Sequence, residues 1–333
     1  MTHVAFAGTF SRSLEARVRA QLRVPCDVTM ADEADIVAKL SDVDVLVSMA
    51  FTGEMGAAAG RLKLVQVPGA GLDRIDRAAV PAGAWLANAY GHETGIAEYV
   101  LGAMLALTRD FARLDAALRR GVWESQWAVG VAPPATWPEL AGRTLGIVGC
   151  GHIGQALARR ARALEMQVLA LRRDVTLPST DDVELLGGPE RLDDLLARAD
   201  YVVLTLPLTA ATRGLIGGAQ LDVMKPSAML INVSRAEIVD EAALYRALAG
   251  RRIAAAALDV WYRYPTEAAP MLPAHHPFHE LPNVLMTPHV SGWTSGMMEA
   301  RARLIAENIA RTTRGGPPLN HIGSQPDDPR GTR

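Results

Sequence analysis

Residues 144–154 read Thr-Leu-Gly-Ile-Val-Gly-Cys-Gly-His-Ile-Gly, and the last three glycines have the spacing G-x-G-x-x-G. The apolar residues at the start predict a short buried strand, and a helix is predicted to begin near His152. In such a turn Gly149 allows the sharp bend, Gly151 lets the backbone approach a pyrophosphate, and Gly154 lets the helix pack closely on the strand. The free N–H groups at the start of the helix attract the charge of the phosphate. Because glycine-rich turns also occur where nothing binds, the surrounding sequence decides what this turn does.

The segments that follow alternate between short apolar runs and helical patterns. Apolar runs at residues 167–171, 201–207, 228–232 and 253–259 predict strands covered on both faces, with helices between them. This alternation is typical of a doubly wound parallel α/β sheet, which binds ligands at the carboxyl ends of its strands. The sequence therefore predicts a dinucleotide-binding domain of the Rossmann type.

A smaller α/β unit is predicted before this domain. Short apolar strands are expected at residues 4–7, 43–48 and 64–67, and a helix is expected at residues 14–22. The third strand ends in Pro68-Gly-Ala-Gly71. These glycines either serve only the turn or present consecutive N–H groups to an anion such as a carboxylate.

Two further helices are predicted at residues 94–120 and from 297 to about 312, because apolar residues recur at helical spacing in both segments. The first is expected to cross between the two domains. The tail from residue 315 is rich in Gly, Pro and charge, and we expect it to be poorly ordered. The irregular connection at residues 121–142 contains three tryptophans that are expected to pack on the crossing helix or on a partner subunit: Trp123, Trp127 and Trp137.

The composition narrows the classes of function. The chain has 333 residues, of which 49% are hydrophobic and 21% charged, and its net charge is -2. This balance argues against general affinity for nucleic acid or anionic membranes. Two cysteines, Cys26 and Cys150, are too few for a disulfide framework or a metal site. No apolar run reaches the roughly 18 residues of a membrane span, and the N-terminus lacks the pattern of a signal peptide, so a cytoplasmic location is expected.

The motifs along the chain resemble those of the D-isomer-specific 2-hydroxyacid dehydrogenases, which include glyoxylate and hydroxypyruvate reductases, phosphoglycerate dehydrogenase and formate dehydrogenase. The resemblance rests on residues 69–76, 97–98, 140–154, 232–235 with 239–240, 257–261 and 287–289. It implies a Rossmann dinucleotide domain at residues 94–293, inserted into a smaller flavodoxin-like α/β substrate domain at residues 1–93 and 294–333. It also implies a homodimer.

Two residues occupy the positions that the family uses for chemistry on a 2-keto acid. Arg235 suits substrate binding, because its planar fork can hold carboxylate and carbonyl oxygens together. His289 suits proton transfer, since the ordinary pKa of histidine lies near 6.5. Taken alone, Arg235 could form a salt bridge to Glu237 or Asp240, and His289 could be a core histidine at a strand end. Within these motifs the catalytic interpretation is favoured.

The resemblance implies roles for further residues by their positions. Substrate binding is expected at Ala70, Gly71 and His92. Cofactor binding is expected at Gly149, Gly151, His152, Ile153, Gly154, Arg172, Arg173, Pro207, Thr212, Val233, Asp259 and Gly292. No metal site is expected, and the histidines at 275, 276 and 279 are interpreted as part of a loop.

Tyr264 departs from the family pattern. The family usually has a glutamate here, whose carboxylate partners the catalytic histidine and raises its pKa. A phenol can orient an imidazole by hydrogen bonding but offers no full charge, so we expect His289 to be less basic than in relatives. The alternative is that the Glu267 side chain moves in to partner His289 in place of the family's glutamate. Formate dehydrogenases carry glutamine here, but the asparagine that they use for formate corresponds to His92, which argues against formate dehydrogenase activity.

A second departure concerns the cofactor. An NAD site requires an acidic residue at the end of the second strand, to bind the ribose 2′-OH. That position is Arg172, followed by Arg173, and two guanidinium groups favour the 2′-phosphate of NADP. Asp174 keeps NAD possible, because a shift of register would bring its carboxylate to the ribose.

Three aromatic residues lie next to the motifs: Trp261, Tyr264 and Trp293. They either line an aromatic substrate site that accepts a larger apolar side chain than that of glyoxylate, or pack in the core.

The leading hypothesis is an NADPH-preferring reductase of small 2-keto acids. The alternative class is a dinucleotide-responsive corepressor on the same fold, which the retention of Arg235 and His289 disfavours.

Overall fold

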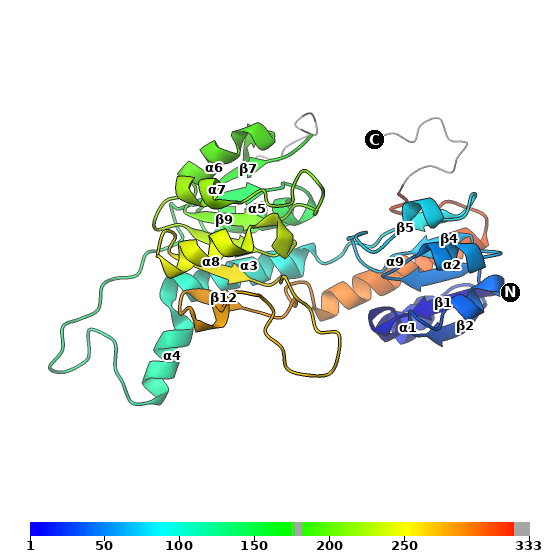
Figure 1. Ribbon diagram of the computed structural model, residues 1–333, viewed down its shortest axis with the longest axis horizontal. Helices are drawn as coiled ribbons and strands as arrows, with labels where there is room; N and C mark the ends of the chain where they lie inside the picture. Colours follow the sequence, from blue (N-terminus) through cyan, green and yellow to red (C-terminus); the bar gives the residue numbers. More distant parts are fainter. Residues whose placement is uncertain (175, 177–181, 323–333) are drawn as a thin grey trace. The chain divides into compact units, whose positions relative to one another are not determined.

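The apolar runs predicted as strands form the centre of a parallel sheet. The computed structural model describes residues 1–174, 176 and 182–322. Within it the chain divides into two units (Figure 1). The smaller unit contains residues 1–92 together with the segment that begins at Trp293, and the larger unit is Glu93–Gly292.

The larger unit contains a seven-stranded sheet with the order β12-β11-β10-β9-β6-β7-β8, and all of its strand pairs are parallel. Its strands are β6 (Thr144–Val148), β7 (Gln167–Leu171), β8 (Glu184–Gly187), β9 (Tyr201–Leu204), β10 (Met229–Asn232), β11 (Ala255–Leu258) and β12 (Val284–Met286). Its helices are α3 (Glu93–Arg109), α4 (Phe111–Arg119), α5 (His152–Ala163), α6 (Leu192–Arg198), α7 (Gly218–Val223) and α8 (Glu241–Ala249).

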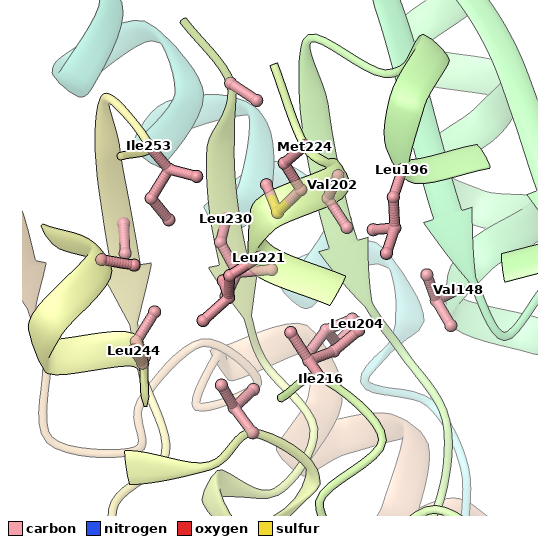
Figure 2. Packing of buried hydrophobic residues seen from close by; sticks show 14 of the residues in the cluster. Val148, Leu196, Val202, Leu204, Ile216, Leu221, Met224, Leu230, Leu244 and Ile253 are labelled. Atoms are coloured by element: carbon pink, nitrogen blue, oxygen red, sulfur yellow. The ribbon is translucent and has the colours of Figure 1, made fainter. Parts of the chain in front are cut away.

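Helices cover both faces of this sheet because successive side chains of each strand point to opposite faces. On β7, Val168 and Ala170 belong to the apolar cluster that includes α3 and α5, whereas Leu169 and Leu171 belong to the cluster that includes α6, α7 and α8. Figure 2 shows the second cluster, in which Leu230 of β10 lies beside Leu221 of α7. The prediction of a doubly wound parallel sheet is confirmed.

The smaller unit is a five-stranded parallel sheet with the order β2-β1-β3-β4-β5, which is the flavodoxin-like order. Its strands are β1 (Thr2–Ala7), β2 (Cys26–Ala31), β3 (Val45–Ser48), β4 (Leu64–Gln66) and β5 (Trp85–Ala87). Its helices are α1 (Thr9–Gln21), α2 (Gly53–Ala58) and α9 (Ser295–Thr313). Residues of α1 and α9 share one apolar cluster with Val4 and Phe6 of β1, so the C-terminal helix completes the N-terminal unit.

Two expectations about the chain are corrected. The helix predicted at residues 94–120 is interrupted, because Asp110 adopts a left-handed conformation with φ of 53° between α3 and α4. The start of the tail is held in place, since the Ile322 N–H donates to the Leu86 carbonyl and His321 pairs with Ala87 in an antiparallel bridge. The rest of the tail, from residue 323, lies outside the described residues.

The three tryptophans of the connection do not all pack on α3. Trp123 and Trp127 are exposed by 60% and 76%, and Trp137 is half-buried. In Figure 1 α4 and the connection extend away from the sheet. None of the helices that the structure describes is long and apolar enough to span a bilayer.

Candidate active site

The glycine-rich turn lies between β6 and α5 and is fixed by backbone hydrogen bonds. The N–H groups of Gly149 and Cys150 both donate to the Leu171 carbonyl, at 3.1 and 2.9 Å. The Thr205 hydroxyl donates to the Gly149 carbonyl at 2.7 Å. Gly149 has φ of 102°, and a Cβ there would lie about 3 Å from the backbone of Thr205 and Leu206. The turn therefore has one conformation, which requires glycine.

The other two glycines differ in what surrounds them. A Cβ on Gly154 would lie 2.9 Å from the Gly149 carbonyl oxygen, so this glycine allows the helix to pack on the turn. A Cβ on Gly151 would meet nothing within 4 Å. Open space at the start of α5 is what a pyrophosphate requires, because it must approach the backbone there. The turn thus fits a dinucleotide.

Two further predicted cofactor residues lie at the start of α5. His152 is its first residue and is exposed, and Ile153 is half-buried against the cluster of α3 and α5.

The end of β7 carries two arginines and a carboxylate, and both Arg172 and the carboxylate form hydrogen bonds within the following turn. The Arg172 Nε donates to the Asp174 carbonyl at 2.8 Å, and Arg173 is exposed. The Asp174 carboxylate accepts hydrogen bonds from the Thr176 hydroxyl at 2.6 Å and the Thr176 N–H at 3.1 Å. These bonds, and secondarily the two arginines, hold the pKa of Asp174 below its ordinary value. The Asp174 carboxylate is therefore hydrogen-bonded within the turn that it forms with Thr176.

The remaining cofactor positions follow the strand ends. The Thr212 hydroxyl donates to the Pro207 carbonyl at 2.7 Å, which closes the loop after β9. Val233 is buried directly after β10, and Gly292 is half-buried at the end of the larger unit. These residues shape the carboxyl edge of the sheet, where ligands of such folds bind.

Arg235 follows β10 in a turn that the Asn232 side chain organises. The Asn232 Oδ1 accepts from the Ser234 N–H at 3.1 Å and from its hydroxyl at 2.8 Å, while Nδ2 donates to the Arg235 carbonyl at 2.9 Å. The Arg235 Nη1 donates to the Ser234 carbonyl at 2.7 Å. Because Asn232 is 1% exposed, the backbone that carries the guanidinium is fixed from inside the protein.

His289 follows β12 in a left-handed conformation with φ of 58°. The Asp259 carboxylate maintains this backbone: it accepts from the Thr287 hydroxyl at 2.6 Å and from the N–H groups of Val290 and Ser291 at 2.9 and 2.8 Å. Asp259 is fully buried. Asp259, which was expected to bind cofactor, therefore also fixes the backbone on both sides of His289. The sequence alone did not predict this role.

Tyr264 contacts His289 directly. Its hydroxyl lies 2.8 Å from the His289 Nδ1 and accepts from the Trp261 N–H at 3.4 Å. Glu267, the alternative partner, is exposed. His289 is exposed, but the protein around the imidazole removes part of its hydration, and this desolvation lowers the pKa of His289. The Asp259 charge opposes this effect, and the Arg235 charge adds to it. Tyr264 is 48% exposed, and partial desolvation raises the pKa of its hydroxyl, which favours the neutral phenol beside the imidazole.

Of the three aromatic residues beside the motifs, Trp261 is buried, whereas Tyr264 and Trp293 are exposed. Trp261 is 5% exposed and its Nε1 donates to the Thr287 carbonyl at 2.8 Å, so it packs in the core. Trp293 is 56% exposed and lies on Phe10, with ring centroids 5.6 Å apart. Among the described residues, no three His, Cys, Asp or Glu side chains are grouped to hold a metal ion.

The predicted substrate-binding residues lie in the smaller unit. Ala70 and Gly71 follow β4 and are half-buried, and Asn88 Nδ2 donates to the Ala70 carbonyl at 3.1 Å. His92 is 8% exposed and its Nδ1 lies 3.2 Å from the Arg301 Nη2 on α9. This last contact was not predictable, since 209 residues separate the two side chains.

Taken together, these features define a Rossmann-fold dinucleotide-binding protein. The sequence profile described as "D-isomer specific 2-hydroxyacid dehydrogenase, NAD binding domain" matches residues 101–291, more than half of the chain. The chain belongs to the D-isomer-specific 2-hydroxyacid dehydrogenase family, as its motifs predicted.

Relatives and solved structures agree with this assignment. The chain is 35% identical to glyoxylate reductase from Pyrococcus furiosus over 84% of its own length and 82% of that protein. It is 36% identical to D-3-phosphoglycerate dehydrogenase from Methanocaldococcus jannaschii, but it spans only about half of that relative, 52%.

Among solved structures, the NADPH-dependent glyoxylate/hydroxypyruvate reductase from Sinorhizobium meliloti, in complex with NADP and sulfate, has a TM-score of 0.77 at 26% identity. The match covers 96% of this chain and 98% of that one. A D-isomer specific 2-hydroxyacid dehydrogenase from Xanthobacter autotrophicus, in complex with NADPH and MES, has a TM-score of 0.78 at 28% identity, with coverage of 96% and 97%.

Proposed function

We propose that this protein reduces small 2-keto acids to D-2-hydroxy acids with NADPH. One observation carries the proposal: Arg235 and His289 follow β10 and β12, the two neighbours of β11, in a sheet whose strands are all parallel. Both therefore lie at the same edge as the glycine-rich turn after β6. The opposing effects of Arg235 and Asp259 on the pKa of His289 support a shared site.

In this proposal each side chain has a separate task. NADPH, when bound, would supply the hydride that C2 of the substrate receives. Arg235 binds the carboxylate and carbonyl oxygens, and its positive charge favours the negative charge that develops on the carbonyl oxygen. His289 in its protonated form gives the proton that this oxygen needs. The Tyr264 hydroxyl accepts the hydrogen bond of the protonated Nδ1 and orients the ring.

The residues at the end of β7 favour NADPH over NADH. Arg172 and Arg173 are positive at the position where an NAD site requires a carboxylate. The Asp174 carboxylate is bonded to Thr176 and is flanked by both arginines. A 2′-phosphate would find two cations there, whereas a ribose 2′-OH would require Asp174 to leave its turn. The complexes of two solved relatives with NADP and NADPH support the same preference.

The larger unit would hold the dinucleotide. Substrate binding by Ala70, Gly71 and His92 of the smaller unit stays a prediction from the resemblance. Both cysteines are free thiols, which supports a reducing, cytoplasmic environment.

We further propose a homodimer, supported by exposed apolar residues on α4 and the connection after it. They are Phe111, Leu118, Val122, Trp123, Trp127 and Val129. Such a concentration of exposed apolar side chains is typical of an interaction surface. Light scattering after size exclusion would give a dimer for the wild type, and a monomer with Trp123 and Trp127 changed to Ser. A monomeric wild type would contradict this proposal.

The test of the activity compares initial rates with NADPH and NADH, each against glyoxylate, hydroxypyruvate, pyruvate and phenylpyruvate. We expect reduction of at least one acid, and a higher kcat/KM with NADPH. Binding of NADPH without turnover of any acid would favour a dinucleotide-responsive binding protein instead.

A further inference from the structure

Thr287 connects the turn that carries His289 to helix α3. The Tyr99 hydroxyl on α3 lies 2.6 Å from the Thr287 Oγ1, and the Thr287 hydroxyl donates to the Asp259 Oδ1, also at 2.6 Å. Tyr99, Thr287 and Asp259 thus form a continuous row of hydrogen bonds. The row ends at the carboxylate that fixes the backbone after His289. It therefore reaches from the histidine to a tyrosine that was not among the predicted site residues.

The direction of both hydrogen bonds follows from the number of protons. A carboxylate only accepts, so the single proton of the Thr287 hydroxyl points at Asp259. The Thr287 oxygen can then only accept from Tyr99, and the phenolic proton must point at Thr287. Partial burial raises the pKa of Tyr99, so the phenol keeps the proton that this bond requires. Successive hydrogen bonds polarise one another, and Tyr99 therefore strengthens the bond from Thr287 to Asp259.

The backbone of Thr287 is hydrogen-bonded as well as its side chain. Its N–H donates to the Leu258 carbonyl at 3.1 Å. Its carbonyl accepts from the Trp261 Nε1 at 2.8 Å and from the His289 N–H at 3.1 Å. The last bond closes a three-residue turn around Pro288, with Thr287 and His289 at its two ends. A change in the orientation of Thr287 is therefore passed directly to His289.

Helix α3 gives this row a fixed starting point. Tyr99 packs against the apolar cluster that includes α3 and α5, and the next residue, Val100, is fully buried in that cluster. Ile231 of β10 and Ala257 of β11 belong to the same cluster. The helix is therefore packed on the strand that leads to Asp259, and this packing fixes the distance between the Tyr99 hydroxyl and the carboxylate.

We propose that Tyr99 is a positioning residue for His289: its hydroxyl holds the Thr287 side chain against Asp259, and the turn that begins at Thr287 holds the imidazole where it gives its proton. The proton transfer rests on the function proposed above. The placement of the imidazole does not, because it depends on hydrogen bonds within the larger unit. Since Tyr99 acts through Thr287, its loss should lower the rate of reduction rather than weaken the binding of the 2-keto acid.

The test removes the Tyr99 hydroxyl alone, in Tyr99→Phe. Tyr201→Phe is a matched control, because the Tyr201 hydroxyl also bonds to a threonine of α3, with its oxygen 2.8 Å from the Thr108 Oγ1. Thr108 lies near the carboxyl end of α3 and is not part of the row that ends at Asp259. Both variants lose one tyrosine–threonine bond to the same helix, so we expect similar melting temperatures. Only Tyr99→Phe acts on the turn of His289.

Hydrogen exchange measured by NMR reports on this turn without any reaction. The N–H groups of Val290 and Ser291 donate to the Asp259 carboxylate. In Tyr99→Phe we expect both amides to exchange about tenfold faster than in the wild type, because the carboxylate is held less firmly. In Tyr201→Phe they should exchange at the wild-type rate. Wild-type exchange in Tyr99→Phe, or an equal increase in both variants, would overturn the proposal.

Steady-state kinetics with saturating NADPH test the consequence for the reaction. We expect Tyr99→Phe to lower the kcat for glyoxylate about tenfold and to leave its KM within about twofold. Tyr201→Phe should keep both constants. When Thr287→Val has already removed the middle of the row, Tyr99→Phe should cause no further loss, since coupled residues are not additive. A wild-type kcat in Tyr99→Phe, an equal decrease in Tyr201→Phe, or a full additional loss beside Thr287→Val would each contradict the proposed role.

Lack of turnover by the wild-type protein with every 2-keto acid would contradict the proposed function instead. The exchange rates of Val290 and Ser291 would then decide the role of Tyr99 by themselves.

Discussion

The Tyr264 hydroxyl lies 2.8 Å from the Nδ1 of His289, where a glutamate is expected from the resemblance to the family. A carboxylate at this place would favour the imidazolium form, but a phenol cannot do so by charge. Desolvation by the surrounding protein and the Arg235 charge instead hold the pKa of His289 below its ordinary value, against the effect of Asp259. The protonated form that the proposed reduction requires is populated below this lowered pKa and is lost as pH rises through it.

Replacing Tyr264 with glutamate should therefore move the activity to higher pH. In Tyr264→Glu the new carboxylate raises the pKa of His289, and we expect the decline of kcat/KM for glyoxylate with NADPH to shift upward by about one pH unit or more. Tyr264→Phe is the control, because it removes the hydrogen bond without adding a charge. Its decline should not shift upward. Coincident pH–rate profiles for the wild type and Tyr264→Glu would refute this account of the histidine.

Removing the two guanidinium groups should weaken the preference for NADPH. In the Arg172→Ala and Arg173→Ala double variant we expect the KM for NADPH to rise about tenfold or more, because hydrogen bonds to charged groups contribute about 1.5–3 kcal/mol. The KM for NADH should change by less than about twofold. Steady-state kinetics with both cofactors measure this difference. An equal rise of the KM for both cofactors would show that the arginines do not recognise the 2′-phosphate.

The three glycines of the turn should respond differently to alanine. Gly151 has open space around it and a φ of -90°, so Gly151→Ala should keep the melting temperature while it weakens NADPH binding. Gly149→Ala places a side chain at φ of 102° and about 3 Å from the backbone, so it should lower the melting temperature. Thermal melting and NADPH titration of both variants test this. Normal NADPH affinity in Gly151→Ala would place the pyrophosphate elsewhere.

The central sheet was predictable because its strands are covered on both faces. A strand with helices on either side must be apolar at nearly every position, and residues 201–204 and 229–232 have that composition. The edge strands lack this continuous apolar composition. β8 is half-buried at best and includes Glu184, and β2 contains the exposed Asp27, so neither was predicted.

Positions in the site were predictable from motifs, but most of their contacts were not. Tyr264 was identified as the residue beside His289 only by comparison with the family pattern. The hydrogen bonds of Asp259 to Val290 and Ser291 join segments about 30 residues apart. Periodicity describes one element at a time, so contacts between elements, such as His92 with Arg301, have no local signature.

The proposed role of His289 as proton donor can be tested most directly by comparing wild-type protein with His289→Asn in the reduction of glyoxylate by NADPH. We predict turnover by the wild type, a kcat about 10³-fold lower in the variant, and the same Kd for NADPH in both. A variant with wild-type kcat would contradict the assignment of His289.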